Sequence, residues 1–178
     1  LGVLKALMSP SVSIREGDVY HTTKPWEAVE LYPLPMPWGA EEFEVYPNRD
    51  SLPFIDQYQL NGGLNIKQFV RGTLRYKGWK NAWKDIFSEI DSLETTKAQS
   101  RLTELSEELW HNFAYKEGEV DRVILTVELK VENNSEIVWH KQYILDTLGN
   151  GQGSAMAQLV SNSVALAVEA ILANDIPP

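Results

Sequence analysis

The sequence predicts an α+β fold in which helices cover one face of a mixed, largely antiparallel β-sheet. Apolar and polar side chains alternate over residues 121–131, and a second strand follows over 136–146 after the turn sequence Asn-Asn-Ser. This pattern is typical of a long antiparallel hairpin. Apolar residues recur instead at helical spacing over residues 79–90, 98–111 and 156–172. Strands and helices therefore occur in separate runs, as in α+β domains.

The composition fits one domain that spans residues 1–178. A chain of 178 residues with 43% hydrophobic residues is long enough to bury most of its apolar surface and to fold without cross-links. It contains no cysteine, which excludes disulfides and thiolate metal sites. Three histidines lie too far apart for the ligand spacing of a zinc site, so we expect no metal. They are His21, His111 and His140.

The charge argues against a nucleic-acid partner. The formal net charge is −9 and the pI is about 4.8, whereas nucleic-acid binding relies on clustered lysine and arginine. No apolar run approaches the ~20 residues that cross a bilayer, and the first residues lack the pattern of a secretory signal. We therefore expect a soluble, cytoplasmic domain that binds neither nucleic acid nor membrane.

Short elements and extended coil are expected before residue 40. Residues 1–8 read as the end of a helix, and residues 17–23 as a turn followed by a short strand. Residues 31–38 carry alternate prolines, which cannot donate to a β-ladder. We predict extended coil laid over the domain at this point; the alternative is a ligand for proline-binding modules.

A first arginine string, residues 46–51 (YPNRDS), follows a predicted strand over 42–46. Ser51 or Asp50 is expected to cap a helix that begins just afterwards. Arg49 would then precede a helix N-terminus, where free amides and the helix dipole favour anions. On these residues alone, contact with a carboxylate ligand and an ion pair with Asp50 explain Arg49 equally well.

A second arginine string, residues 71–76 (RGTLRY), ends a predicted strand over 66–76. Alternation places Arg71, Thr73 and Arg75 on one face of that strand. Arg71 and Arg75 would lie about 13 Å apart, which suits separate groups on an elongated ligand. Because arginine matches a carboxylate with two parallel hydrogen bonds, the two strings indicate a small molecule with several carboxylates.

Two predicted helices follow and are assigned to core and surface. The first helix has one apolar face. We expect this face to pack in the core, an interpretation favoured over stacking on a ligand ring. That face comprises Trp79, Trp83, Ile86, Phe87 and Ile90. The second buries three leucines and exposes three acids, which we assign to a solvated face. These are Leu102, Leu105 and Leu109, and Glu104, Glu107 and Glu108.

The C-terminal third should end in a glycine-rich loop and a long helix. Residues 149–154 (GNGQGS) suggest a dinucleotide-binding turn, but the preceding strand belongs to a hairpin and the third glycine position holds Ser154. We therefore predict a mobile loop with Ser154 as helix cap. The apolar faces of the hairpin lead us to expect a homodimer. The expected buried stripe of the helix comprises Met156, Leu159, Val160, Val164, Val168, Ile171 and Leu172.

The two arginine strings, in this order and separation, resemble the substrate-domain signature of the saccharopine dehydrogenase family, whose enzymes handle a three-carboxylate adduct of lysine and glutamate. Residues 2–10 resemble the helix before the first string, and residues 115–123 and 153–157 resemble the family's later hairpin and long helix. Residues 92–99 depart from longer members, which place a helical insertion there. The resemblance implies the C-terminal domain of a Rossmann-type dehydrogenase without its nucleotide-binding domain. Both chain ends, including residues 176–178, would then be cut connections to that domain.

The function implied by this resemblance is that of a substrate-binding domain in an NAD(P)-dependent oxidoreductase acting on the CH–NH group of saccharopine. NAD(P) would be bound mainly by the missing domain and none by this fragment, so the fragment alone should be inactive. No catalytic acid or base can be named. The implied substrate contacts are Arg49, Thr73, Leu74 and Arg75, with Asn48 and Arg71 as further candidates.

Two other functions stay open. A related reductase, as in carboxynorspermidine synthesis, would keep the architecture but join an aldehyde to an amine with fewer carboxylates; the two arginine strings favour saccharopine. A non-catalytic interaction or dimerisation domain would keep the fold alone. Sequence upstream distinguishes the enzymes from the binding protein, because a strand followed by a glycine-rich turn would indicate a nucleotide-binding domain.

Overall fold

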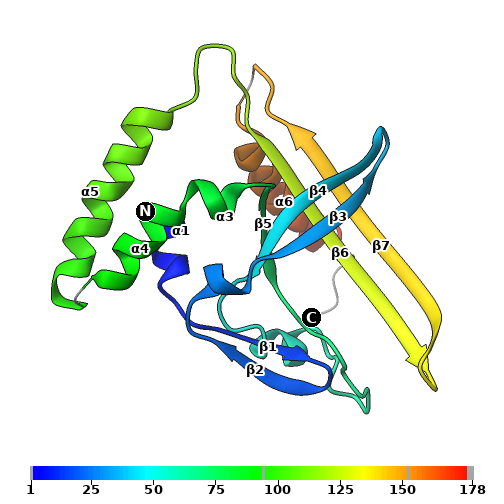
Figure 1. The fold of residues 1–178 in the computed structure, drawn as a ribbon. Coiled ribbons are helices and arrows are strands. Elements are labelled where there is room, and N and C mark those ends of the chain that lie inside the picture. Colours follow the sequence, from blue (N-terminus) through cyan, green and yellow to red (C-terminus); the bar gives the residue numbers. More distant parts are fainter. Residues whose placement is uncertain (1, 94, 152, 176–178) are drawn as a thin grey trace. The chain divides into compact units, whose positions relative to one another are not determined.

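The computed structural model describes residues 2–93, 95–151 and 153–175, with the backbone alone at residues 95–99 (Figure 1). It confirms an α+β fold, although the described strands form three separate antiparallel sheets where the sequence predicted one. The chain divides into two compact units, Leu1–Phe113 and Ala114–Pro178, and each is described by itself below. Our assignment of residues 1–178 to one domain stays a prediction.

The first unit begins with helix α1 (Gly2–Leu7) and the hairpin of strands β1 (Ser11–Arg15) and β2 (Asp18–Thr22). The helix and the second strand confirm the sequence prediction, whereas β1 was missed. Its inward residues are Ser11 and Ser13, which are buried. Because the buried face of β1 is polar, the strand lacks the apolar alternation by which strands are recognised.

The proline-rich segment forms a strand, β3 (Glu30–Met36), and the prediction of coil is wrong. A short 3-10 turn, η1 (Pro25–Ala28), precedes it. Strand β3 lies at the edge of a three-stranded sheet in the order β3-β4-β5. Pro33 and Pro35 are two residues apart, so both nitrogens face the open edge, where a missing N–H costs no ladder hydrogen bond.

Strand β4 (Gly39–Pro47) is the centre of this sheet and ends at Pro47, as predicted. Strand β5 (Gly72–Tyr76) is shorter than the strand predicted over residues 66–76. The missing part leaves the sheet and reaches β1, where Phe69 and Ile14 exchange two backbone hydrogen bonds of 3.0 Å. The segment before Gly72 therefore satisfies its backbone groups with a different partner strand.

Four helices complete the described part of the first unit: α2 (Pro53–Gln57), α3 (Trp79–Ala82), α4 (Lys84–Ser92) and α5 (Thr95–Phe113). The sequence predicted α3 and α4 as one helix, but Trp83 leaves helical geometry at φ −99° and ψ 9°. Helix α5 confirms and extends the helix predicted over 98–111. Its acids Glu104 and Glu108 both pair with Arg101, whose guanidinium holds the pKa of Glu108 below its usual value.

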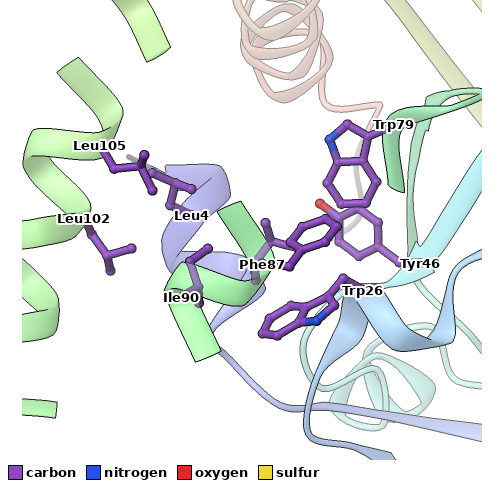
Figure 2. Close-up of a cluster of buried hydrophobic side chains, with 9 residues drawn as sticks. Leu4, Trp26, Tyr46, Trp79, Phe87, Ile90, Leu102 and Leu105 are labelled. Atoms are coloured by element: carbon purple, nitrogen blue, oxygen red, sulfur yellow. The ribbon is translucent and has the colours of Figure 1, made fainter. Parts of the chain in front are cut away.

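Aromatic rings form the centre of the core, which confirms their assignment to packing. Figure 2 shows the rings gathered on one side of the cluster and the aliphatic residues on the other. Trp26 and Phe87 stack at 5.4 Å between ring centroids, and Tyr46 and Trp79 at 5.0 Å. The aliphatic side comprises Leu4, Ile90, Leu102 and Leu105. Leu7 also belongs to the cluster.

The second unit contains the predicted hairpin, formed by strands β6 (Arg122–Asn133) and β7 (Glu136–Leu148). Asn134 and Ser135 join them, with φ values of 49° and 66°. Positive φ at both central residues is typical of the tight turn whose twist matches an antiparallel hairpin.

Helix α6 (Ala155–Leu172) also forms as predicted, and the Ser154 hydroxyl accepts a hydrogen bond from Ala157 N at 3.1 Å. The prediction of a buried stripe is wrong, because Leu159 is half-buried and the other six predicted members are exposed. With 18 residues and a mean hydropathy of 1.5, α6 could cross a bilayer by length and composition alone, which corrects the statement that no apolar run is long enough. One such helix is weak evidence for a membrane.

The loop before α6 is organised around an internal carboxylate. Asp121 accepts hydrogen bonds from Ala155 N at 2.7 Å and Met156 N at 3.1 Å, the first amides of the helix. A Cβ at Gly149 would lie 2.5 Å from the same carboxylate, so glycine permits this approach. The helix end that resembled a phosphate-binding turn is thus occupied by Asp121, which supports the rejection of a dinucleotide site. Gln152, within this loop, lies outside the described residues.

Acidification is expected to destabilise the second unit through two aspartates. The amides of α6 lower the pKa of Asp121, and the Arg122 guanidinium lowers that of Asp146. A folded pKa below the unfolded value of 3.8 contributes stability above that value, and the contribution is lost as the pH falls through the folded pKa. Thermal unfolding followed from about pH 5 downward should show this loss. In Asp121→Asn the pH dependence should be weaker; an unchanged slope would contradict the assignment.

Candidate functional site

The structure brings the two arginine strings side by side. Strand β4 ends where β5 begins, with Pro47 opposite Gly72 and Tyr46 opposite Thr73. Asn48 N continues the pairing by donating to the carbonyl of Arg71 at 2.8 Å. Two segments more than twenty positions apart in sequence therefore lie side by side, as the carboxylate-binding hypothesis requires.

Ser51 joins the two strings and does not cap a helix. Its side chain is fully buried, and its hydroxyl accepts a hydrogen bond from Arg71 N at 3.0 Å. The residue at the cap of α2 (Pro53–Gln57) is Leu52, so the prediction of a Ser51 or Asp50 cap is wrong. Asp50 instead accepts from Leu52 N at 2.9 Å. Because α2 has only five residues, its dipole is too short to supply an anion site.

Arg49 has an unfavourable backbone conformation that the surrounding structure holds in place. Its φ is 58°, in the left-handed region that residues with a side chain rarely adopt. The Arg49 carbonyl accepts from Val12 N at 3.0 Å, and Ser51 N donates to the Val12 carbonyl at 2.8 Å. The side chain is exposed, and among the described residues it forms no ion pair, so the alternative of a pair with Asp50 is absent there. Strain held in this way is common at binding sites.

Arg75 is half-buried and directed at the aromatic core. Its Nη2 lies 3.4 Å from the Tyr46 hydroxyl, and its Cζ lies 5.7 Å from the centroid of the Trp79 ring. Its Nε is buried and has no hydrogen-bond partner among the described residues. Thr73 and Leu74, on the same strand, are half-buried. The Nε of Arg15 is also buried without a partner among the described residues, so this feature does not by itself distinguish Arg75 as a ligand-binding residue.

Arg71 and Asn48 complete the group of candidate residues. The Arg71 Cζ lies 3.6 Å from the centroid of the Phe54 ring, and the side chain is exposed. The Asn48 Oδ1 is buried and without a partner among the described residues. Phe54 was missed by the sequence analysis, because nothing in the pattern of α2 indicates which arginine its ring would contact.

The candidate arginines differ from the other arginines of the chain in their partners. In a chain with six arginines and a net charge of −9, Arg49, Arg71 and Arg75 have no carboxylate partner among the described residues. The remaining three are ion-paired. They are Arg15 with Glu30, Arg101 with Glu89, Glu104 and Glu108, and Arg122 with Asp146.

The residues of the two arginine strings do not line the described cavity, and the described residues form no metal site beside them. A cavity of about 510 Å³ opens between α1, α5 and Trp83, and none of its lining residues belongs to either string. The described residues contain no group of three or more metal-binding side chains. His140 Nε2 lies 3.0 Å from Glu128 Oε1 in the hairpin. The structure thus brings the two strings together, and the described cavity lies elsewhere in the first unit.

A protein family and two known proteins resemble this chain. The family described as the saccharopine dehydrogenase C-terminal domain matches residues 1–178. A relative from Pyricularia oryzae, named saccharopine dehydrogenase [NADP(+), L-glutamate-forming], is 28% identical over 241 residues, which cover 96% of this chain and 52% of the relative. A mouse protein, named alpha-aminoadipic semialdehyde synthase, mitochondrial, is 32% identical over 83 residues, or 46% of this chain and 8% of the relative.

The chain spans about half the length of the fungal relative and a small part of the mouse one. The aligned stretch of 241 residues is longer than the 178 residues of this chain, so the fungal relative carries additional residues within it. This agrees with a shortened insertion, although the alignment length does not locate it. The match over every residue, together with the two adjoining arginine strings, shows that the chain belongs to the saccharopine dehydrogenase C-terminal domain family.

Proposed function

We propose that this chain is the substrate-binding domain of an NAD(P)-dependent oxidoreductase that acts on saccharopine. The observation that carries the proposal is a group of three arginines that have no carboxylate partner among the described residues and that lie on two hydrogen-bonded strings in an acidic chain. Arginines that have no carboxylate partner among the described residues favour an anionic ligand. The family and the name of the fungal relative indicate which anion and which chemistry.

The roles of the residues follow from their positions. Arg49, on the exposed turn, and Arg75, at the edge of the core, would each hold a carboxylate of the substrate. The Thr73 hydroxyl or backbone groups beside Leu74 would complete the contact, and Asn48 offers a buried acceptor. These residues orient the substrate, and the nicotinamide cofactor supplies the hydride chemistry when it is bound.

The cofactor is proposed to be bound by another part of the complete protein. The Gly149 loop and the start of α6 are the described segment most similar to a phosphate-binding turn, and Asp121 occupies that helix end. A carboxylate at this position would repel a pyrophosphate. The chain alone is therefore expected to bind saccharopine weakly and to turn over nothing.

A homodimer is part of the proposal. Both strands of the β6–β7 hairpin carry large apolar side chains that are exposed in the second unit, among them Leu125, Val127, Trp139 and Tyr143. Exposed apolar patches of this kind are typical of surfaces that another chain or another domain covers. Sedimentation of the complete protein as a monomer would contradict the dimer.

The proposed function is tested by the absorbance of the nicotinamide ring in the complete protein, with saccharopine and with NAD⁺ or NADP⁺ in turn. We expect reduced cofactor to form only when saccharopine is present. If neither cofactor is reduced by an intact, folded protein, the proposed reaction is wrong.

Arg49→Gly should separate binding from stability. Glycine adopts positive φ without the steric cost that arginine carries at 58°, so the Tm of the variant is expected to equal or exceed that of the parent. Loss of the guanidinium should weaken saccharopine binding by about tenfold or more, since hydrogen bonds to charged groups are the strong ones. Calorimetric titration and thermal unfolding check the two effects. A variant that loses stability but keeps its affinity would show that Arg49 is structural.

A further inference from the structure

Arg71 is held in place from two sides. Its backbone N–H donates to the buried Ser51 hydroxyl at 3.0 Å, and its carbonyl accepts from Asn48 N at 2.8 Å. The two peptide groups of Arg71 thus fix its Cα beside the turn that carries Arg49. The side chain leaves this fixed point toward solvent.

The guanidinium of Arg71 is positioned by an aromatic ring. A distance of 3.6 Å from Cζ to the centroid of Phe54 corresponds to contact with the face of the ring. Contact through the flat face leaves the N–H donors at the edge of the guanidinium free for a carboxylate. Phe54 is itself held by the ring of Tyr58, at 5.9 Å between centroids.

A comparison within the chain shows that a ring contact alone does not explain this arrangement. Arg15 also lies over a ring, that of Tyr20 at 5.8 Å, but it pairs with Glu30. Arg71 has the closer ring contact and no carboxylate partner among the described residues. In a chain with 25 acidic residues, an arginine that is fixed, stacked on a ring and without an acidic partner among the described residues is suited to an external anion.

We propose that Arg71 is a third carboxylate-binding residue of the site and that Phe54 is its positioning residue. The inference rests on the proposed function and deepens it, because it assigns three guanidinium groups to a ligand with three carboxylates. A ligand with two carboxylates would leave one of the three unmatched. Arg71 therefore contributes to the choice of a tricarboxylate over a dicarboxylate. Holding the guanidinium on a ring before binding reduces the ordering that binding requires.

The test measures the affinity for saccharopine and the steady-state kinetics of the complete protein. Glutarate, a dicarboxylate, is the probe that competes with saccharopine for binding. Arg71→Met should weaken saccharopine binding by about 10- to 100-fold and raise KM with kcat little changed. The Arg71→Met variant should lose less affinity for glutarate than for saccharopine. Arg15→Met is the matched control, and its affinity for saccharopine should equal that of the parent protein.

Phe54 is tested by two variants that differ in the ring. Phe54→Leu should weaken saccharopine binding by about two- to fivefold, the size expected for an exposed contact between a cation and a ring. Phe54→Tyr keeps the ring and should restore the parental affinity. The Tm of each variant is recorded, because a purely structural role would lower Tm without changing the affinity of the folded protein.

The outcomes separate this inference from the proposed function. If Arg75→Met weakens saccharopine binding while Arg71→Met and Phe54→Leu do not, the third site is wrong and the proposed function stands. An equal loss for glutarate and saccharopine in Arg71→Met would overturn the selective role. If the parent protein does not bind saccharopine, the proposed function fails and this inference fails with it.

Discussion

Replacing Arg75 with methionine is expected to raise the KM for saccharopine steeply in the complete protein while leaving nucleotide affinity nearly unchanged. Arg75 is half-buried, and its Nε has no partner among the described residues. Methionine keeps an unbranched apolar chain of about the length of the aliphatic part of arginine and removes the guanidinium, whose Cζ lies over the Trp79 ring. Removing one partner of a desolvated charge pair costs about 2–4 kcal/mol, which is about 30- to 1,000-fold in affinity.

The control for this variant is Arg15→Met, which removes an arginine of the same unit that already has an internal partner in Glu30. Its kinetics should match those of the parent, since exposed ion pairs contribute about 0–1 kcal/mol. Steady-state measurements at varied saccharopine and at varied cofactor distinguish the two affinities. Equal kinetics in Arg75→Met and the parent would end the assignment of the two strings to substrate binding.

Replacing Phe87 with alanine should destabilise the first unit by about 3–5 kcal/mol, the usual cost of deleting a buried phenylalanine ring. Phe87 is 6% exposed and stacks on Trp26, with its edge toward Trp79 at 5.1 Å. Its loss would leave a cavity among these rings, and the stacked arrangement limits how far they can close it. Denaturant unfolding followed by near-UV circular dichroism reports on the packed tryptophans.

Phe113→Ala is the matched control, because that phenylalanine is 78% exposed at the end of α5. Its effect on the free energy of unfolding should stay within about 0.5 kcal/mol. If Phe87→Ala costs less than about 1 kcal/mol, the rings do not form the centre of this core. The effect would also reach the site, because Tyr46 and Trp79 belong to the cluster and contact Arg75.

Sequence patterns located the elements whose structure depends on local signals. The β6–β7 hairpin combines long alternation with a turn of Asn134 and Ser135, and helix α6 begins at a serine cap. The tryptophans of α3 and its neighbours follow helical spacing and lie in the core. In each case one short stretch contains both the periodicity and the residue that begins or ends the element.

The errors concern features set by distant parts of the chain. Pro33 and Pro35 fit a strand because β3 lies at the edge of its sheet, which local sequence does not reveal. Ser51 bonds to Arg71 across twenty positions instead of capping the adjacent helix. The apolar stripe of α6 predicted burial, but no described element covers it within its unit.

The candidate site shows the same division. The sequence contained Arg49 and Arg75 in separate strings, and the expectation that both strings serve one ligand followed from a resemblance and not from spacing. The structure supplied the pairing of Pro47 with Gly72 and the contact between Phe54 and Arg71. These contacts depend on the register of β4 with β5, which no local pattern determines.

A structure of the complete protein with bound saccharopine tests the central claim most directly. We expect separate carboxylates of the ligand to lie about 2.7–2.9 Å from guanidinium nitrogens of Arg49 and Arg75, the range of charge-assisted hydrogen bonds. Saccharopine bound away from both strings, or both guanidinium groups turned to acids of the protein itself, would contradict the account.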